Sequence, residues 1–295
     1  MFNNIMIAVR PEPVCDCALD KALGLAQRFE SNLHLLNIMG RDEGWGAMRF
    51  LGPSGQERER RKSLFKHYGW KLEAVDQYDV SVTSGMAYSE ILRWARRWRA
   101  DLIVLGPHVP PEDRRARSWG MDRPTLEQVG SRARCPVMCV PRSEPYGEQR
   151  FRVILAAVDF SRESRCAVEF AGELARRFGS TLHLLHVLEE QPSRKDSLAS
   201  ARERLHHEYG KMIRGVENLV PGVLGGEPAD RILTQAAVSG ADLIVLGHRR
   251  LQPDSGQSIL GRVSRGAACP TVSVSHPLRA CAAWSAVSRH AAAYG

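Results

Sequence analysis

The chain has 295 residues, of which 43% are hydrophobic and 25% charged. This length is about twice that of a typical domain, and the composition is that of a globular protein rather than a disordered one. Seven cysteines argue against a disulfide scaffold, and a net charge of +8 shared evenly by both halves argues against a dedicated nucleic-acid-binding domain. Apolar runs are too short to span a membrane and no secretory signal is found, so we expect a cytoplasmic location.

The chain repeats itself once. Residues 22–36 and 171–185 are identical at 10 of 15 positions, and the heptapeptide ADLIVLG of residues 100–106 recurs unchanged at 241–247. The pair Cys135-Pro136 then recurs as Cys269-Pro270, in the same order. Such ordered self-similarity predicts two copies of one domain. We place them at residues 1–143 and 150–276, joined by the Pro- and Gly-containing segment Pro141–Gln149 and followed by an extension over 277–295.

The first copy contains two segments with helical character. Gln56–Leu72 is charged and is expected to form a solvated surface helix. The segment RWARRWR of Arg93–Arg99 places its tryptophans on one helical face with Ile91 and Ala95. We therefore expect the tryptophans to face the sheet and the arginines to face water, rather than a nucleic-acid site.

The second copy alternates short apolar strands with helices. Strands are expected at Val153–Val158, Thr181–Val187, Val220–Leu224, Leu243–Leu246 and Thr271–Val274, and helices after Ser161, over Ser197–Asn218 and over Ala229–Ser239. Strands separated by helices imply parallel strands covered on both faces. The fold class is therefore α/β, doubly wound, twice over, and ligands of such sheets bind beyond the carboxyl ends of the strands.

Four segments of the second copy resemble the universal stress protein family: VILAAVDFSRES, TLHLLHV, GGEPADRIL with ADLIVLG, and CPTVSV. The first copy matches through NLHLLNI, SGMAYSEIL, ADLIVLG and CPVMCV. The resemblance is to the tandem, two-domain form of the UspA-like family. It implies Rossmann-like domains of the adenine-nucleotide α-hydrolase-like type, each with a mainly parallel five-stranded sheet.

Nucleotide-binding members of this family carry an Asp after the first strand and a loop of the pattern Gly, two residues, Gly, nine residues, then Gly-Ser or Gly-Thr. Backbone N–H groups of such a loop approach phosphates closely. The second copy keeps Asp159 and Gly247 but has Arg250 at the second glycine, and Gln257-Ser258 or Gly256 near the third. The resemblance implies ATP or AMP, with Mg²⁺, at a site formed by Val158, Asp159, Ser161, Val187, Leu246, Gly247, Arg249, Arg250, Gly256 and Ser258.

Several of these residues also have a purely structural interpretation. Ser161 is expected to cap the following helix, with Ser164 three residues on. Arg249 and Arg250 are either phosphate contacts or part of a solvated loop. No residue spacing indicates a metal site, and no nucleophile beside a general base indicates an enzyme.

The first copy departs further from the family pattern. Arg10 stands at the position of the Asp, and Val109 at the second glycine. Arg123-Pro124 falls where Gly-Ser would be, and proline offers no N–H donor. We therefore expect no nucleotide in the first copy.

These observations predict a cytoplasmic stress-response module that regulates or protects, is not an enzyme, and binds an adenine nucleotide in its second copy. The two copies are expected to pair within the chain as a pseudo-dimer through their last strands, at Pro136–Val140 and Pro270–Val274. A homodimer and an unidentified regulatory protein are further candidate partners, whereas membrane and nucleic acid are not expected. The alternatives that remain open are a nucleotide-free scaffold and, less favoured, a slow ATPase.

Overall fold

A computed structural model describes residues 1–10, 16–39, 55–106, 123–141, 150–188, 195–248 and 258–275. It divides the chain into two compact units, Met1–Val129 with Val137–Gln149, and Gly130–Pro136 with Arg150–Gly295. Each unit contains most of one copy of the repeat.

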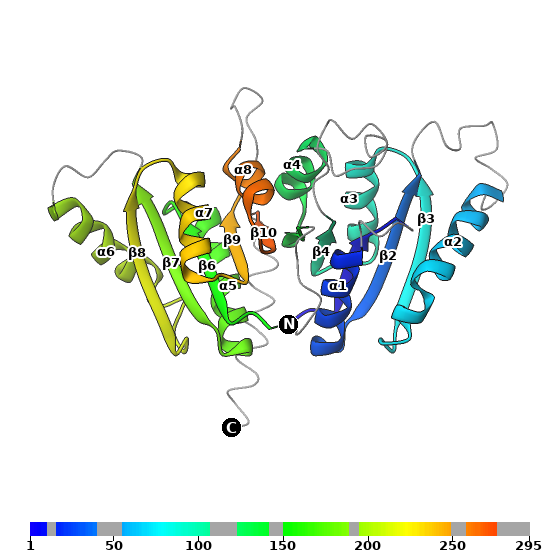
Figure 1. Cartoon of the computed structure of the whole chain (residues 1–295), viewed down its shortest axis with the longest axis horizontal. Coiled ribbons are helices and arrows are strands. Elements are labelled where there is room, and N and C mark those ends of the chain that lie inside the picture. Colours follow the sequence, from blue (N-terminus) through cyan, green and yellow to red (C-terminus); the bar gives the residue numbers. More distant parts are fainter. Residues whose placement is uncertain are drawn as a thin grey trace. The chain divides into compact units, whose positions relative to one another are not determined.

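The first copy alternates five strands with four helices (Figure 1). In chain order these are β1 (Asn4–Ala8), α1 (Asp16–Phe29), β2 (Asn32–Met39), α2 (Gly55–Leu72), β3 (Tyr78–Ser84), α3 (Ala87–Arg97), β4 (Leu102–Leu105), α4 (Arg123–Arg132) and β5 (Val137–Cys139).

The second copy repeats this order. Its elements are β6 (Val153–Val158), α5 (Arg162–Phe178), β7 (Thr181–Leu188), α6 (Lys195–Tyr209), β8 (Asn218–Gly225), α7 (Pro228–Ser239), β9 (Leu243–Gly247), α8 (Ile259–Gly266) and β10 (Thr271–Val274).

Most predicted elements of the second copy are found within a residue or two of their expected bounds, but the predicted end of one helix was wrong. The helix expected to reach Asn218 ends at Tyr209. Met212 N and Ile213 N both donate to the Tyr209 carbonyl, at 2.9 and 3.2 Å, and so close a tight turn there.

All described strand pairs within each copy are parallel. The strand order is β3-β2-β1-β4-β5 in the first copy and β10-β9-β6-β7-β8 in the second. The chain thus moves outward from the first strand in one direction and then returns to the other side of it, which confirms the doubly wound α/β prediction.

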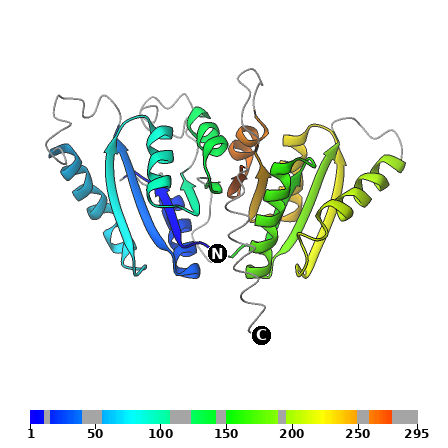
Figure 2. The ribbon, with the colours of Figure 1, turned by 180° about the vertical axis from the view of Figure 1, so that it is seen from behind.

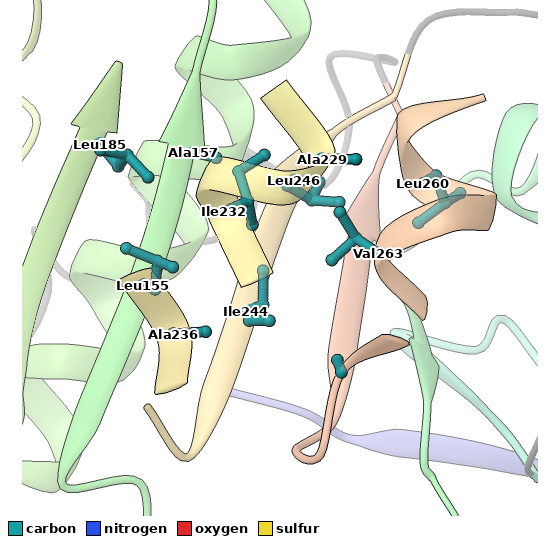
Figure 3. Close-up of a cluster of buried hydrophobic side chains, with 11 residues drawn as sticks. Leu155, Ala157, Leu185, Ala229, Ile232, Ala236, Ile244, Leu246, Leu260 and Val263 are labelled. Atoms are coloured by element: carbon teal, nitrogen blue, oxygen red, sulfur yellow. The ribbon is translucent and has the colours of Figure 1, made fainter. Parts of the chain in front are cut away.

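The reversal of direction places helices on both faces of each sheet (Figures 1 and 2). In the second copy, α7 and α8 pack against side chains of β6, β7 and β9 (Figure 3). This apolar cluster includes the fully buried residues Leu155, Ala229, Ile244 and Val263. A buried strand such as β9 (LIVLG) reads as a continuous apolar run because helices cover both of its faces.

Charged links join the first two helices of each copy. In the first copy, α1 supplies acids and α2 bases: Lys71 Nζ lies 2.7 Å from Asp20, and His67 Nε2 lies 3.3 Å from Asp16. In the second copy the polarity is reversed, because Arg165 of α5 pairs with Glu208 of α6.

Two helices of the second copy end in glycines with left-handed backbone. Gly179 has φ 66° after α5, and Gly240 has φ 62° after α7. The matching residues of the first copy are Glu30, with φ 53°, and Arg99, with φ 51°. A residue with a Cβ is less stable than glycine in the left-handed region of backbone conformation. At these two helix ends the first copy therefore carries backbone strain that the second copy avoids.

Gly179→Ala is expected to lower the free energy of unfolding by about 1 kcal/mol, since a Cβ at Gly179 meets no atom within 4 Å and only backbone strain is added. Glu30→Gly is the matched opposite change and should stabilise the first copy. Denaturant unfolding of both variants tests this. Equal midpoints for all three proteins would contradict it.

Candidate functional site

The carboxyl ends of β6, β7 and β9 meet at one edge of the second sheet. The register pairs Val158 with His186 on one side of β6, and Ala157 with Leu246 on the other. The segments after these strands therefore begin side by side. This edge is where ligands of doubly wound sheets bind.

Asp159 follows β6 directly and is fixed by a network of short hydrogen bonds. Its Oδ1 accepts from Ser161 N at 3.0 Å and from Ser164 Oγ at 2.5 Å. Ser164 Oγ in turn accepts from Asp159 N at 3.1 Å. Among the described residues, Asp159 Oδ2 has no hydrogen-bond partner, and the side chain is exposed. The arrangement holds one carboxylate oxygen and leaves the other open to a further hydrogen bond.

The same network keeps Asp159 ionised. Partial burial alone would raise the pKa of its carboxyl group, but the hydroxyls of Ser161 and Ser164 and the backbone N–H groups of Asp159 and Ser161 outweigh burial and lower the pKa. The site therefore presents a negative charge and a hydrogen-bond acceptor at neutral pH.

Ser161 has the capping role expected from the sequence. It precedes α5, and its Oγ accepts from Ser164 N at 3.1 Å. Because Ser164 also bonds Asp159, the cap and the carboxylate form one unit. Whether Ser161 contacts a ligand as well stays a prediction.

Gly247 ends β9 and lies against the first turn of α5. A Cβ at this position would meet Ser164 N at 2.5 Å and Glu163 C at 2.6 Å, distances that side chains do not tolerate. The glycine thus brings the end of β9 to the helix turn that carries the Asp159 network. Its presence has a structural reason that holds with or without a nucleotide.

The three apolar residues predicted for the site turn their side chains to the protein interior. Val158 is buried, Leu246 lies in the core cluster labelled in Figure 3, and Val187 packs against that cluster. The Val158 and Leu246 side chains are buried, whereas that of Val187 is partly exposed.

The remaining predicted residues surround the next helix. Ser258 is the N-cap of α8, and its Oγ accepts from Gly261 N at 3.1 Å. Arg249, Arg250 and Gly256 lie outside the described residues, so their predicted roles stay predictions.

Three neighbours of Asp159 were missed by the sequence analysis. His186 places Nδ1 2.8 Å from the Val158 carbonyl, and because a carbonyl only accepts, this nitrogen carries the proton. Phe160, with φ 60°, lies between His186 at 4.5 Å and Tyr209 at 5.9 Å between ring centroids, with the Arg204 guanidinium 4.1 Å from its ring centre. A signal existed only for Tyr209, since Tyr-Gly recurs at 68–69 and 209–210.

Tyr209 is fully buried beneath this edge. Burial, followed by the negative charge of Asp159, raises the pKa of its phenol to about 12, against the opposing effects of the Phe160 N–H and Arg165. The hydroxyl is therefore protonated and neutral in any physiological condition.

The first copy uses the same positions with different chemistry. Asn37 takes the place of His186, and its Nδ2 donates to the Val9 carbonyl at 2.8 Å. Tyr68 takes the place of Tyr209 and donates to the carbonyl of Arg10, the residue that replaces Asp159. An acidic position has thus become basic on the same scaffold.

The tryptophan-arginine segment packs largely as expected. Ile91 and Ala95 are buried, and Trp98 stacks on His34 of β2 at 4.7 Å between centroids. Arg93 and Arg97 are exposed, but both lie over the Trp94 ring, at 5.1 and 5.0 Å, rather than pointing straight to water.

In the part of the chain that the structure describes, no three His, Cys, Asp or Glu residues gather in a way that could hold a metal ion. No described helix is long and apolar enough to cross a bilayer.

A family model described as the universal stress protein family matches the chain twice, over residues 1–141 and 150–275. The chain belongs to the universal stress protein family. Its tandem, two-domain form was predicted from the repeat, and this prediction is confirmed. No curated protein matches the chain.

Solved universal stress proteins share the fold over nearly the whole chain. One from Archaeoglobus fulgidus DSM 4304 is 16% identical, covers 93% of this chain and 99% of its own, and has a TM-score of 0.67. A putative universal stress protein from Pseudomonas aeruginosa UCBPP-PA14 is 18% identical, covers 98% of each chain, and has a TM-score of 0.65.

Gly247→Ala is expected to destabilise this universal stress protein by about 1–3 kcal/mol, because backbone atoms of α5 must move to admit the methyl group. Gly222→Ala in β8 is the control, since a Cβ there meets only Leu185 Cδ1 at 3.6 Å. The midpoints of denaturant unfolding of the two variants and the wild type measure this difference. The explanation is wrong if both variants unfold alike.

Asp159→Asn is expected to make the protein less sensitive to acid. A lowered pKa in the folded state gives stability that is present above about pH 4 and is lost as the pH falls through the folded-state pKa. The variant lacks this contribution at pH 7 and so loses less on acidification.

Unfolding midpoints at pH 7 and pH 3 measure this difference. Asp76→Asn, at an exposed position of the first copy, serves as the charge-matched control and should keep the wild-type response. An identical pH response of Asp159→Asn and the wild type would refute the assignment.

Proposed function

We propose that the chain is a stress-response binding module that takes an adenine nucleotide, ATP or AMP, at the carboxyl edge of its second sheet. The observation that carries this proposal is the Asp159 carboxylate. It is ionised and exposed, one oxygen is held by Ser161 and Ser164, and the other has no partner among the described residues. A carboxylate so placed accepts hydrogen bonds from the amino or hydroxyl groups of a nucleoside.

The phosphates would extend toward the segment between β9 and α8. The resemblance to the family supports this direction, and so does the N-terminus of α8, an eight-residue helix whose N-cap is Ser258. Arg249 and Arg250 precede that helix in the sequence and are the proposed phosphate contacts. Mg²⁺ would enter together with the nucleotide, so no resident metal is proposed.

We propose binding rather than catalysis. The Ser164 hydroxyl is buried and donates to Asp159 while it accepts from the Asp159 N–H, so it is committed to the helix turn. A serine whose hydroxyl is engaged in this way does not act as a nucleophile, and the carboxylate that it holds is suited to binding a ligand.

A nucleotide-free scaffold is the second candidate function. Gly247 and Ser258, the residues that resemble the family's nucleotide loop, both have structural duties in close packing and helix capping. Their presence is therefore explained without a ligand, and protein partners would then act on the surface of the two copies.

Calorimetric titration of ATP and AMP, with and without Mg²⁺, into the full chain freed of co-purified ligand tests the proposal. We expect about one equivalent to bind, and Asp159→Ala to weaken binding at least tenfold, because a hydrogen bond to a charged group contributes about 1.5–3 kcal/mol. Arg10→Ala, the matched position of the first copy, is the control and should bind as the wild type does.

Two results would overturn the proposal. Failure of the wild type to bind at millimolar nucleotide would favour the scaffold, and unchanged binding by Asp159→Ala would move the site elsewhere. Steady hydrolysis of ATP that Asp159→Ala abolishes would replace the binding module with an ATPase.

A further inference from the structure

The two copies treat an equivalent buried tyrosine differently. Tyr68 and Tyr209 lie 141 residues apart at matching positions, and both are fully buried. The Tyr68 hydroxyl donates to the main-chain carbonyl of Arg10, whereas the Tyr209 hydroxyl donates to no described residue. A buried hydroxyl without an acceptor for its proton is costly, so the second copy gives up an interaction that the first copy makes.

The difference traces to one peptide unit. Asp159 is the residue that matches Arg10, and its carbonyl is the acceptor that Tyr209 lacks. The N–H of the next residue, Phe160, faces the Tyr209 oxygen instead. In a trans peptide the N–H and C=O groups point in opposite directions, and no described peptide bond is cis. The Asp159 carbonyl therefore points away from the Tyr209 hydroxyl.

Phe160 adopts strained backbone in this orientation. Its φ of 60° lies in the left-handed region, which is unusual for a residue with a Cβ. In the first copy the residue after Arg10 is a proline, a type whose ring excludes positive φ and whose nitrogen carries no hydrogen. The first copy is thus restricted by its sequence to the inward carbonyl, while the second copy has a choice.

The Phe160 ring has contacts that offset the strain. It lies between the His186 and Tyr209 rings, and Arg204 of α6 places its guanidinium 4.1 Å from the ring centre. Backbone strain at a candidate site, maintained by surrounding contacts, is an indication of function rather than of a defect.

We propose that the Asp159–Phe160 peptide has two positions and that its position sets the affinity of the second-copy site. In the outward position, the carbonyl adds an acceptor beside the Asp159 carboxylate for an amino or hydroxyl group of a nucleoside. In the inward position, which the first copy adopts at Arg10, the carbonyl accepts from the tyrosine hydroxyl and is withdrawn from the ligand. Tyr209 is thus a positioning residue, and this inference rests on the proposed nucleotide function.

Three substitutions of Phe160 test whether the orientation of the Asp159–Phe160 peptide controls affinity. All three remove the aromatic ring, so differences among them come from the backbone. Phe160→Gly, Phe160→Ala and Phe160→Pro all lack the ring and differ in their access to positive φ: glycine adopts it freely, alanine at a cost, and proline not at all. We expect ATP affinity by calorimetry to fall in that order, by about fivefold from Gly to Ala and further to Pro.

Tyr209→Phe separates positioning from simple packing. It removes the hydroxyl that favours the inward carbonyl, so adding it to Phe160→Ala should recover about threefold or more of the lost affinity. Adding it to Phe160→Pro should recover nothing, because proline cannot return to positive φ. If Tyr209 served only for packing, adding Tyr209→Phe would weaken binding in both the Phe160→Ala and the Phe160→Pro variants.

Crystal structures of Phe160→Gly and Phe160→Pro give a readout that needs no nucleotide. We expect the residue 159 carbonyl to point away from Tyr209 in the Gly variant and to accept from its hydroxyl in the Pro variant. The same carbonyl orientation in both variants would overturn the two-position peptide.

The outcomes also separate this inference from the proposed function. Equal nucleotide affinity of the Gly, Ala and Pro variants would overturn the peptide's role while leaving nucleotide binding intact. A wild type that binds no nucleotide would overturn the proposed function and the effect on affinity together, and the two crystal structures would still decide whether the peptide moves.

Discussion

The contact between Gly247 and the first turn of α5 is the constraint on which the second-copy site depends. With a Cβ, the end of β9 would collide with Ser164 N and Glu163 C. Because the residue is a glycine, β9 ends directly against the turn whose serines hold Asp159. The helix cap, the ionised carboxylate and the strand end therefore form one rigid group, and the order of the candidate site comes from packing that precedes any ligand.

The repeat and the apolar runs were enough to predict the fold, because buried parallel strands such as Leu243–Gly247 are marked by composition alone. The Ser161 cap was likewise predictable, since its chemistry is local. The helix end at Tyr209 was missed although Gly210 directly follows it, and a glycine just past a helix is a stop signal. His186 and Phe160 were missed for a deeper reason: a ring bonded to a neighbouring strand and a positive φ in a non-glycine residue are products of tertiary contacts.

The two copies share one fold but carry different residues at the carboxyl edge of the sheet. In each copy a side chain of the second strand donates to a main-chain carbonyl at the end of the first strand. Asn37 donates to Val9, directly after β1, and His186 donates to Val158, the last residue of β6. The residues directly after that carbonyl differ between the copies. The first copy has Arg10 with its carbonyl turned to the buried Tyr68, and the second has an exposed Asp159 beside Tyr209, whose hydroxyl donates to no described residue. The divergence concerns a few side chains and one peptide plane, while the strand order is the same.

The reversed charges between the first two helices of each copy have a consequence for assembly. Two similar domains in one chain can exchange equivalent elements while they fold, which is a known route to misassembly of repeats. If α2 and α6 changed places, Asp16 would face Glu208, so two carboxylates would meet where each copy now joins an acid to a base. The correct pairing instead joins opposite charges in both copies. Each sheet thereby discriminates its own helix from the homologous helix of the other copy, through repulsion of the wrong partner as much as attraction of the right one.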